Sequence, residues 1–156
     1  MFKRLLLVLC NVATVGIFAV ADMFRDTHLW NPAWPGHARF HLGIQFTSLS
    51  LLAAVGTYFL LRRKEVSRAE LVIGTLAPAT FWPGLFVAAL IPGADVYSTE
   101  GARQNGYPAN LAVAGFMVAL TALGWMWSVR GGAPSKGGPE SRPEAGFKRS
   151  PNTEQD

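Results

Sequence analysis

Four long apolar stretches divide the chain, and polar or charged segments separate them. They run from Leu5 to Met23, from Phe40 to Leu61, from Leu71 to Ile91 and from Ala109 to Val129. Each is close to the roughly 20 residues that a helix needs to cross about 30 Å of hydrocarbon. Among Asp, Glu, Lys and Arg, only Asp22 occurs within them. A helix of a soluble bundle would carry a polar face, so the pattern indicates membrane spans.

We therefore expect an all-α, polytopic membrane protein that forms a four-transmembrane-helix up-down bundle. The spans are predicted at about 5–23, 38–61, 70–91 and 109–129, within one domain of residues 1–130. From residue 131 to 156 the chain is rich in Gly, Pro, Ser and charge. Such a segment buries too little apolar surface to offset the entropy of ordering, so it is predicted to be a disordered cytoplasmic tail.

The net charge of +4 follows the predicted topology. Basic residues cluster before the first span, in the second connection and after the fourth span, and they include Lys3, Arg4, Arg62, Arg63, Lys64, Arg68 and Arg130. The positive-inside rule then puts both termini in the cytoplasm and the first and third connections outside. This distribution indicates a lipid bilayer as the partner and no nucleic acid, with the bacterial inner membrane as the default location.

The first apolar stretch allows a second interpretation. Basic residues, an apolar segment and an A-x-A arrangement at Ala19 and Ala21 also describe a signal peptide covering residues 1–21. Asn11 interrupts the apolar segment and the run continues through Met23, which favours a retained helix. Cys10, the single cysteine, cannot form an intramolecular disulfide and is expected to pack in the bundle.

The third and fourth stretches carry features that affect helix packing. Pro78 and Pro83 each remove a backbone donor, which leaves the carbonyls of Gly74 and Ala79 without their helical partners. This predicts either a simple kink or a polar cavity beside the third span. In the fourth stretch, Gly115 and Ala119 belong to a stripe of small residues suited to close helix contact, within the bundle or with an oligomer or membrane partner.

All three histidines, His28, His37 and His41, lie in the segment THLWNPAWPGHARFH between the first two spans. The following helix is expected to begin either with Asn31 as its N-cap or after a restart at Pro35. Both starts place the second and third histidines in or near the first two turns. The titratable chemistry of this chain is therefore concentrated at one end of the second span.

On that helix, His37, His41, Gln45 and Ser48 follow one another at spacings of four, four and three residues, so they share one face. Arg39 points nearly the opposite way. Polar side chains find no partner in lipid, so we expect the stripe to face the bundle interior.

The first span offers a candidate partner face for this stripe. Four of its residues recur at spacings of three, four and four: Asn11, Thr14, Phe18 and Asp22. If the two stripes meet, Asp22 comes near His37 or His41 at the mouth of a pocket. The other expected pocket residues, which would contact substrate, are Trp34, Arg39, Gln45, Asp95 and Arg103.

Three chemistries fit this set of residues. A divalent metal ion would take His28, His37 and His41 as nitrogen ligands, with Asp22 or Asp26 supplying oxygen. Alternatively, His37 and His41 act as acid-base groups on a lipid-soluble substrate, with Asp22 orienting them. In the third interpretation these residues only cap helices and anchor the segment to lipid headgroups.

The outer segment NPAWPGHARFH, followed by Gln45 and preceded by Ala21 and Asp22, resembles a family of small four-helix bacterial and fungal membrane proteins. The four-span layout is also similar to that of DoxX-like membrane proteins, although no DoxX motif can be matched to residues here. The resemblance implies the four-helix fold and no particular reaction.

Two classes of function follow from these patterns. The first is a small membrane enzyme, or an enzyme-like binding protein, that handles a hydrophobic substrate at a His/Asp pocket. The second is a non-catalytic accessory or assembly subunit of a membrane complex, which would use Gly115 and Ala119 for contact.

Overall fold

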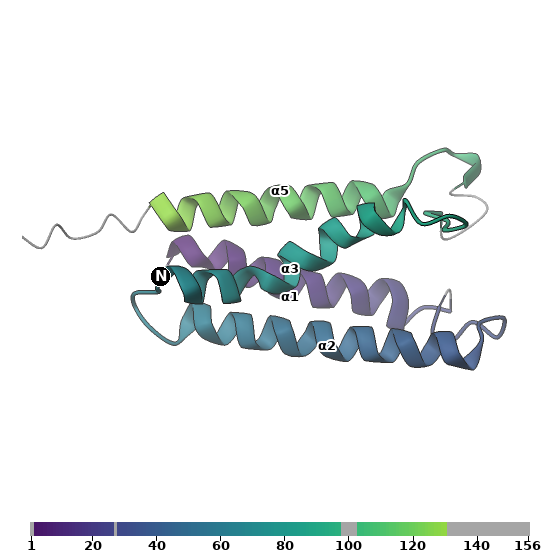
Figure 1. Ribbon diagram of the computed structural model, residues 1–156, viewed down its shortest axis with the longest axis horizontal. Helices are drawn as coiled ribbons and strands as arrows, with labels where there is room; N and C mark the ends of the chain where they lie inside the picture. The colour runs from purple at the N-terminus through teal and green to yellow at the C-terminus, as the bar shows by residue number, and fades with distance from the viewer. Residues whose placement is uncertain (1, 27, 98–102, 131–156) are drawn as a thin grey trace, which may run out of the picture.

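The structure, a computed structural model, describes residues 2–26, 28–97 and 103–130, and this part of the chain is helical with short connections (Figure 1). The elements are α1 (Phe2–Phe18), which continues into one turn of π-helix, η1 (Ala19–Met23), then α2 (Gly36–Leu61), α3 (Arg68–Ala88) and α5 (Ala109–Arg130). Four helices are long and apolar enough to cross a membrane. The predicted number of long apolar helices is confirmed, while the predicted tail lies outside the described residues.

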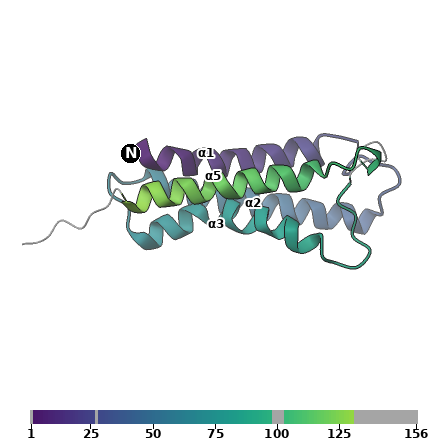
Figure 2. The same ribbon diagram turned by 90° about the horizontal axis from the view of Figure 1, so that it is seen from above.

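Successive helices alternate in direction (Figures 1 and 2). One end of the bundle, here the basic end, holds the start of α1, the α2–α3 connection and Arg130. The opposite end, here the loop end, holds the connections that follow η1 and α3. Helix α1 packs against α2, α3 and α5. Helix α3 likewise packs against α1, α2 and α5, so these two helices hold the bundle together.

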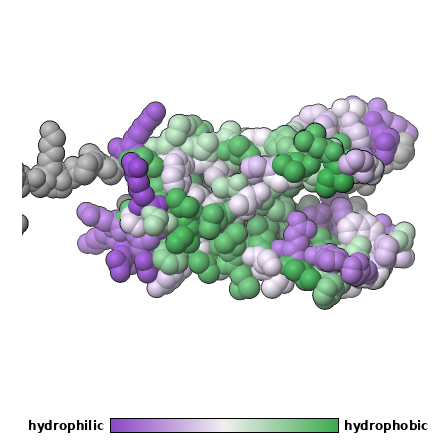
Figure 3. Space-filling view, viewed as in Figure 1, coloured by the Kyte–Doolittle hydropathy of each residue, from purple (hydrophilic) through white to green (hydrophobic). Residues whose placement is uncertain are grey.

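The sides of the bundle are apolar and its two ends are more hydrophilic (Figure 3). Large apolar side chains exposed on the sides include Leu9, Val12, Leu51, Val55, Phe116 and Leu123. Monomeric soluble proteins rarely expose contiguous apolar surface on this scale. The surface is thus compatible with a multi-pass membrane protein.

Helix α3 changes direction near its middle, where it contains Pro78 and Pro83 (Figure 1). The sequence predicts that proline leaves the Gly74 carbonyl without its helical donor. In the structure, Nδ2 of Asn11 donates to that carbonyl at 2.7 Å. A side chain of α1 thus replaces the hydrogen bond that proline removes from α3.

A second polar contact joins the same two helices. Thr14 donates its hydroxyl hydrogen to the Cys10 carbonyl at 2.7 Å, and Nε1 of Trp82 donates to Oγ1 of Thr14 at 2.9 Å. All three side chains are buried. Because both contacts lie between apolar neighbours, they fix the rotation of α1 against the kinked α3.

The basic end is held together by Arg4, whose side chain is only 7% exposed. Its guanidinium donates to the carbonyls of Leu60 at 2.8 Å, Arg63 at 2.9 Å and Lys64 at 2.7 Å. The Leu60 carbonyl belongs to the last turn of α2, where carbonyls lack helical donors, and the other two carbonyls lie in the connection that follows the helix. In the sequence Arg4 is only one of the basic residues that indicate topology, so its contacts at the end of α2 are a finding of the structure.

Helix α3 starts with a capping box. Ser67 accepts a hydrogen bond from the Glu70 backbone N–H at 3.2 Å, and the Glu70 carboxylate accepts one from the Ser67 N–H at 2.8 Å. The same carboxylate pairs with Arg62 at the end of α2, and this hydrogen bond raises the pKa of the arginine. The α2–α3 connection is therefore held from both sides.

Candidate functional site

A cavity of about 750 Å³ opens at the loop end of the bundle, where all four helices and the connection after η1 contribute to its wall. It forms because the second half of α3 bends away from α2 toward α5 (Figure 1). Figure 3 shows a notch on the side of the molecule between α2 and the second half of α3. Of the two outcomes that the sequence left open for the prolines, the structure shows a kink that borders a cavity.

The inner part of the cavity is apolar and aromatic. Phe18 and Phe81 meet edge to face with their ring centroids 5.3 Å apart, and Phe18 also stacks on Phe46 at 5.8 Å. Trp82 forms part of the wall with only 2% of its surface exposed, since Thr14 holds its indole N–H. Leu85 completes this side. These groups offer a surface for hydrocarbon.

Ionisable residues in the cavity wall come from η1 and the connection that follows it. Asp22 and His28 both line the cavity, with Oδ1 of the aspartate 3.2 Å from Nδ1 of the histidine. The connection folds back on η1. The Leu29 N–H donates to the Asp22 carbonyl at 3.3 Å, and the Trp30 indole N–H donates to the Met23 carbonyl at 2.9 Å. These bonds hold the histidine beside the carboxylate.

Two further features position this pair. In η1 the Phe24 N–H donates to the Ala19 carbonyl at 2.9 Å, an i to i+5 bond that adds a residue to the turn carrying Asp22. Such π-helical turns frequently occur at functional sites. The ring of Trp34 meets the ring of His28 edge to face at 4.9 Å, which limits movement of the imidazole. Asp22 and Trp34, two of the residues that the sequence assigned to a pocket, therefore both line this cavity.

His37 and His41 lie elsewhere. Both are exposed on α2, and their Nε2 atoms are 2.9 Å apart. The expectation that their stripe faces the bundle interior is wrong, as is the expected pairing with Asp22, whose partner is His28. The reason is a rotation of α2: the helix buries the adjoining face, which carries Leu42, Leu49 and Ala53.

Gln45 belongs to the same stripe but also borders the cavity, as the sequence predicts for a pocket residue. Helix α2 itself begins at Gly36 with Pro35 as its N-cap residue, close to the second of the two predicted starts. Asn31 instead accepts a hydrogen bond from the Ala33 N–H at 2.9 Å within the preceding turn.

The predicted three-histidine metal site is not assembled. Within residues 2–26, 28–97 and 103–130, no group of three or more His, Cys, Asp or Glu side chains is placed to hold a metal ion. His28 contacts Asp22, whereas His37 and His41 contact each other. The donors that the sequence grouped together are divided between the cavity wall and the exposed surface of α2.

The remaining predicted contact residues, Arg39, Asp95 and Arg103, are not among the residues that form the wall of this cavity. Arg39 donates to the Asn31 carbonyl at 2.7 Å and so braces the start of α2. Arg103 forms an ion pair with Asp95, which borders a smaller cavity of about 140 Å³.

Three polar residues of the cavity wall, Arg25, Thr80 and Asn110, were not identified from the sequence. The sequence proposed His28 only as a metal ligand, and its contact with Asp22 as an ion-pair partner is a finding of the structure. The spacing of six residues between Asp22 and His28 does not match a helical repeat, because His28 lies in the connection after η1. Thr80 lies between Pro78 and Pro83, and these prolines are the sequence signal that predicted a cavity beside α3.

In comparisons with known proteins, no protein family, no curated protein and no solved structure matches this chain.

Proposed function

We propose that the protein is a multi-pass membrane protein whose cavity binds a hydrophobic small molecule, and that Asp22 and His28 act on its polar end by acid-base chemistry. The cavity of about 750 Å³, apolar inside and with an ionisable pair in its wall, is the observation that carries this proposal. Its volume is in the range of pockets that hold small organic ligands. Ionisable residues within a membrane span are costly and usually functional.

The distribution of charge supports a location in the cell membrane with both termini in the cytoplasm. The described basic residues at the basic end are Arg4, Arg62, Arg63, Lys64, Arg68 and Arg130. Under the positive-inside rule this end faces the cytoplasm and the cavity lies toward the outer leaflet. The bacterial inner membrane is the location that we propose.

Contacts of the first helix support its retention in the mature protein. Asn11 supplies the donor for the Gly74 carbonyl, and Asp22 belongs to the cavity wall. Loss of residues 1–21 as a signal peptide would remove the first contact and leave the second residue at a new chain end.

The chemistry that we assign to the pair is proton transfer. A carboxylate beside Nδ1 of an imidazole orients the ring, and an imidazole can both give and take a proton near neutral pH. His28 is therefore the proposed acid-base group and Asp22 its orienting partner. This replaces the role that the sequence suggested for His37 and His41.

Binding is tested by filling the cavity. Gly84 lies in the cavity wall, and a Cβ atom added there meets no atom within 4 Å, so Gly84→Leu is expected to fold and to obstruct the space. Gly16→Leu is the matched control, because Gly16 is also helical and unobstructed but lies outside the wall. Mass spectrometry of extracts from the purified protein should find an amphiphile with wild type and Gly16→Leu, and lose it with Gly84→Leu. Equal amounts in all three would refute the proposal.

The acid-base role needs a separate measurement. Asp22→Asn keeps the shape of the side chain and removes its charge, so the variant should retain the bound molecule while its converted form disappears from cell membranes. If the converted form persists in both Asp22→Asn and His28→Ala cells, the pair is not catalytic. That result would favour the accessory-subunit class, in which changes at the exposed Gly115 and Ala119 should matter instead.

A further inference from the structure

We infer that the molecule bound in the cavity is an anionic amphiphile, and that Arg25 binds its negatively charged head group. This inference rests on the proposed function, because it names the chemical class of the molecule that the cavity holds. It is argued from the charge of the cavity wall, from the partners of each ionisable side chain and from the apolar surface deeper in the cavity.

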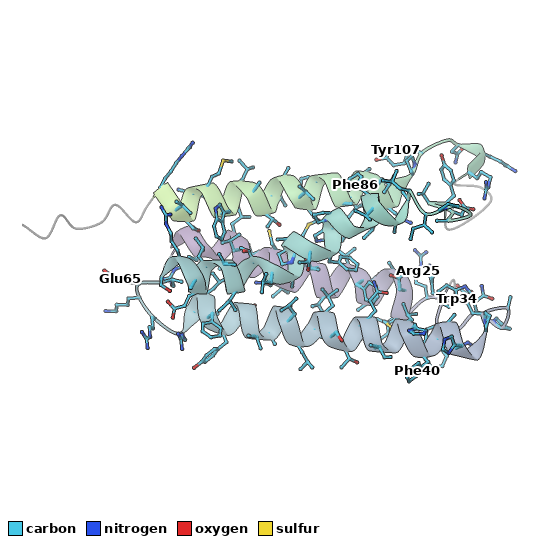
Figure 4. All side chains as sticks on the ribbon, viewed as in Figure 1. Arg25, Trp34, Phe40, Glu65, Phe86 and Tyr107 are labelled. Carbon is cyan, nitrogen blue, oxygen red and sulfur yellow. The ribbon has the colours of Figure 1, made fainter. Side chains whose placement is uncertain are left out.

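Arg25 lines the cavity just after the end of η1. In Figure 4 its side chain lies in the space between the end of α1 and the second half of α3, whereas Phe40 points away from the bundle. Its guanidinium makes no hydrogen bond or ion pair with another described residue. The other arginines of this end are engaged, Arg39 with the Asn31 carbonyl and Arg103 with Asp95.

Among the described residues, the cavity wall contains three ionisable side chains, namely Asp22, Arg25 and His28. The aspartate and the histidine contact each other, so the arginine is the ionisable residue whose hydrogen-bond donors are left for a ligand. A guanidinium offers a planar set of donors that matches the oxygens of a carboxylate, sulfonate or phosphate. Arg25 is exposed, so these donors are accessible to a ligand that enters the cavity.

The rest of the wall fits an alkyl or acyl chain. Beyond the ionisable groups lie Phe18, Phe81 and Leu85, with the buried Trp82 beside them. Because the notch between α2 and α3 opens on the side of the bundle, a chain can enter it from the bilayer (Figure 3). One end of the cavity thus suits an anion and the other suits hydrocarbon, which is the polarity of a single amphiphilic molecule.

The test uses three brominated probes with the same alkyl chain and different head groups: a sulfonate, an alcohol and a trimethylammonium. Bromine quenches nearby tryptophan fluorescence, and Trp34 and Trp82 both line the cavity. The full chain is reconstituted in phosphatidylcholine nanodiscs, and each probe is titrated against wild type and Gly84→Leu. The difference between these two proteins isolates quenching within the cavity from quenching of tryptophans that face lipid.

We expect the sulfonate to bind the wild-type cavity most tightly. Arg25→Gln should weaken the sulfonate about tenfold, which is the size of effect for a charged hydrogen bond, and leave the alcohol unchanged. Arg25→Lys should keep part of the preference. Arg68→Gln, which changes the net charge equally at the basic end, should have no effect.

The outcomes separate this inference from the proposed function. If the sulfonate and the alcohol bind the cavity equally, or if the trimethylammonium binds best, the cavity holds a hydrophobic molecule but the anionic class is wrong. If no probe distinguishes wild type from Gly84→Leu, the cavity does not bind amphiphiles and both proposals fail. A normal elution profile of Arg25→Gln on size exclusion, together with unchanged alcohol binding, ensures that its loss of sulfonate binding does not reflect misfolding.

Discussion

Asn11 replaces the backbone donor that Pro78 removes from α3, and this predicts an energetic coupling between two residues that are 67 positions apart in the sequence. Nδ2 of Asn11 lies 2.7 Å from the Gly74 carbonyl oxygen, and the side chain is 1% exposed. In the Pro78→Ala variant a backbone N–H is again present to reach that carbonyl. The contribution of the Asn11 side chain should therefore depend on whether residue 78 is proline.

The magnitude follows from the alternatives open to the Gly74 carbonyl. In wild type, Asn11→Leu leaves a buried carbonyl without a donor, which costs about 1–3 kcal/mol. Hydrogen bonds between membrane helices have measured contributions of about 0.6–1.7 kcal/mol. The Oδ1 atom of Asn11 is buried without a partner among the described residues, so its removal offsets part of this cost. The unfolding free energy of Asn11→Leu alone therefore does not measure the hydrogen bond to the Gly74 carbonyl. A double-mutant cycle with Pro78→Ala does, because it cancels the Oδ1 contribution.

We expect a coupling free energy of about 1 kcal/mol between Asn11→Leu and Pro78→Ala. The assay is reversible unfolding of the four proteins in mixed micelles of increasing SDS content, followed by tryptophan fluorescence. Asn110→Leu is the control partner for Pro78→Ala, because Asn110 donates to the Val96 carbonyl at the loop end. Additive effects of the two changes at residues 11 and 78, within about 0.3 kcal/mol, would show that Asn11 does not substitute for the missing donor.

Two further predictions concern the two ends of the bundle. His28→Ala should remove the converted form of the cavity ligand from cell membranes, whereas the double change of His37 and His41 to alanine should not, because those two rings are exposed on α2. Mass spectrometry of membrane extracts checks this, and the reverse order of effects would contradict the assigned site. Arg4→Gln should lower the free energy of unfolding by about 2–3 kcal/mol, since three carbonyls lose a charged donor. Arg63→Gln, an exposed arginine at the same end, should change it by less than about 0.5 kcal/mol in the same SDS titration.

The sequence by itself determined the number of long helices and most of their boundaries. An apolar stretch of about 20 residues has one low-energy form in a bilayer, because a helix satisfies all of its backbone groups internally. Local chemistry also identified the Gly74 carbonyl as the one that Pro78 leaves without a donor, and it singled out Asp22 as an ionisable residue within a span. These conclusions depend only on neighbours along the chain.

Only the tertiary structure decided which face of each helix turns inward and which side chains meet. A helix that is apolar on all sides gives little sequence signal for its rotation, so the stripe of His37 and His41 was assigned to the interior although Leu42 and Leu49 occupy that face. The pairing of Asp22 with His28 depends on how a connection folds back, which no helical period encodes. The Asn11 contact depends on the packing of α1 beside the kink of α3, since apolar length fixes where a helix begins and ends but contacts between helices fix its rotation.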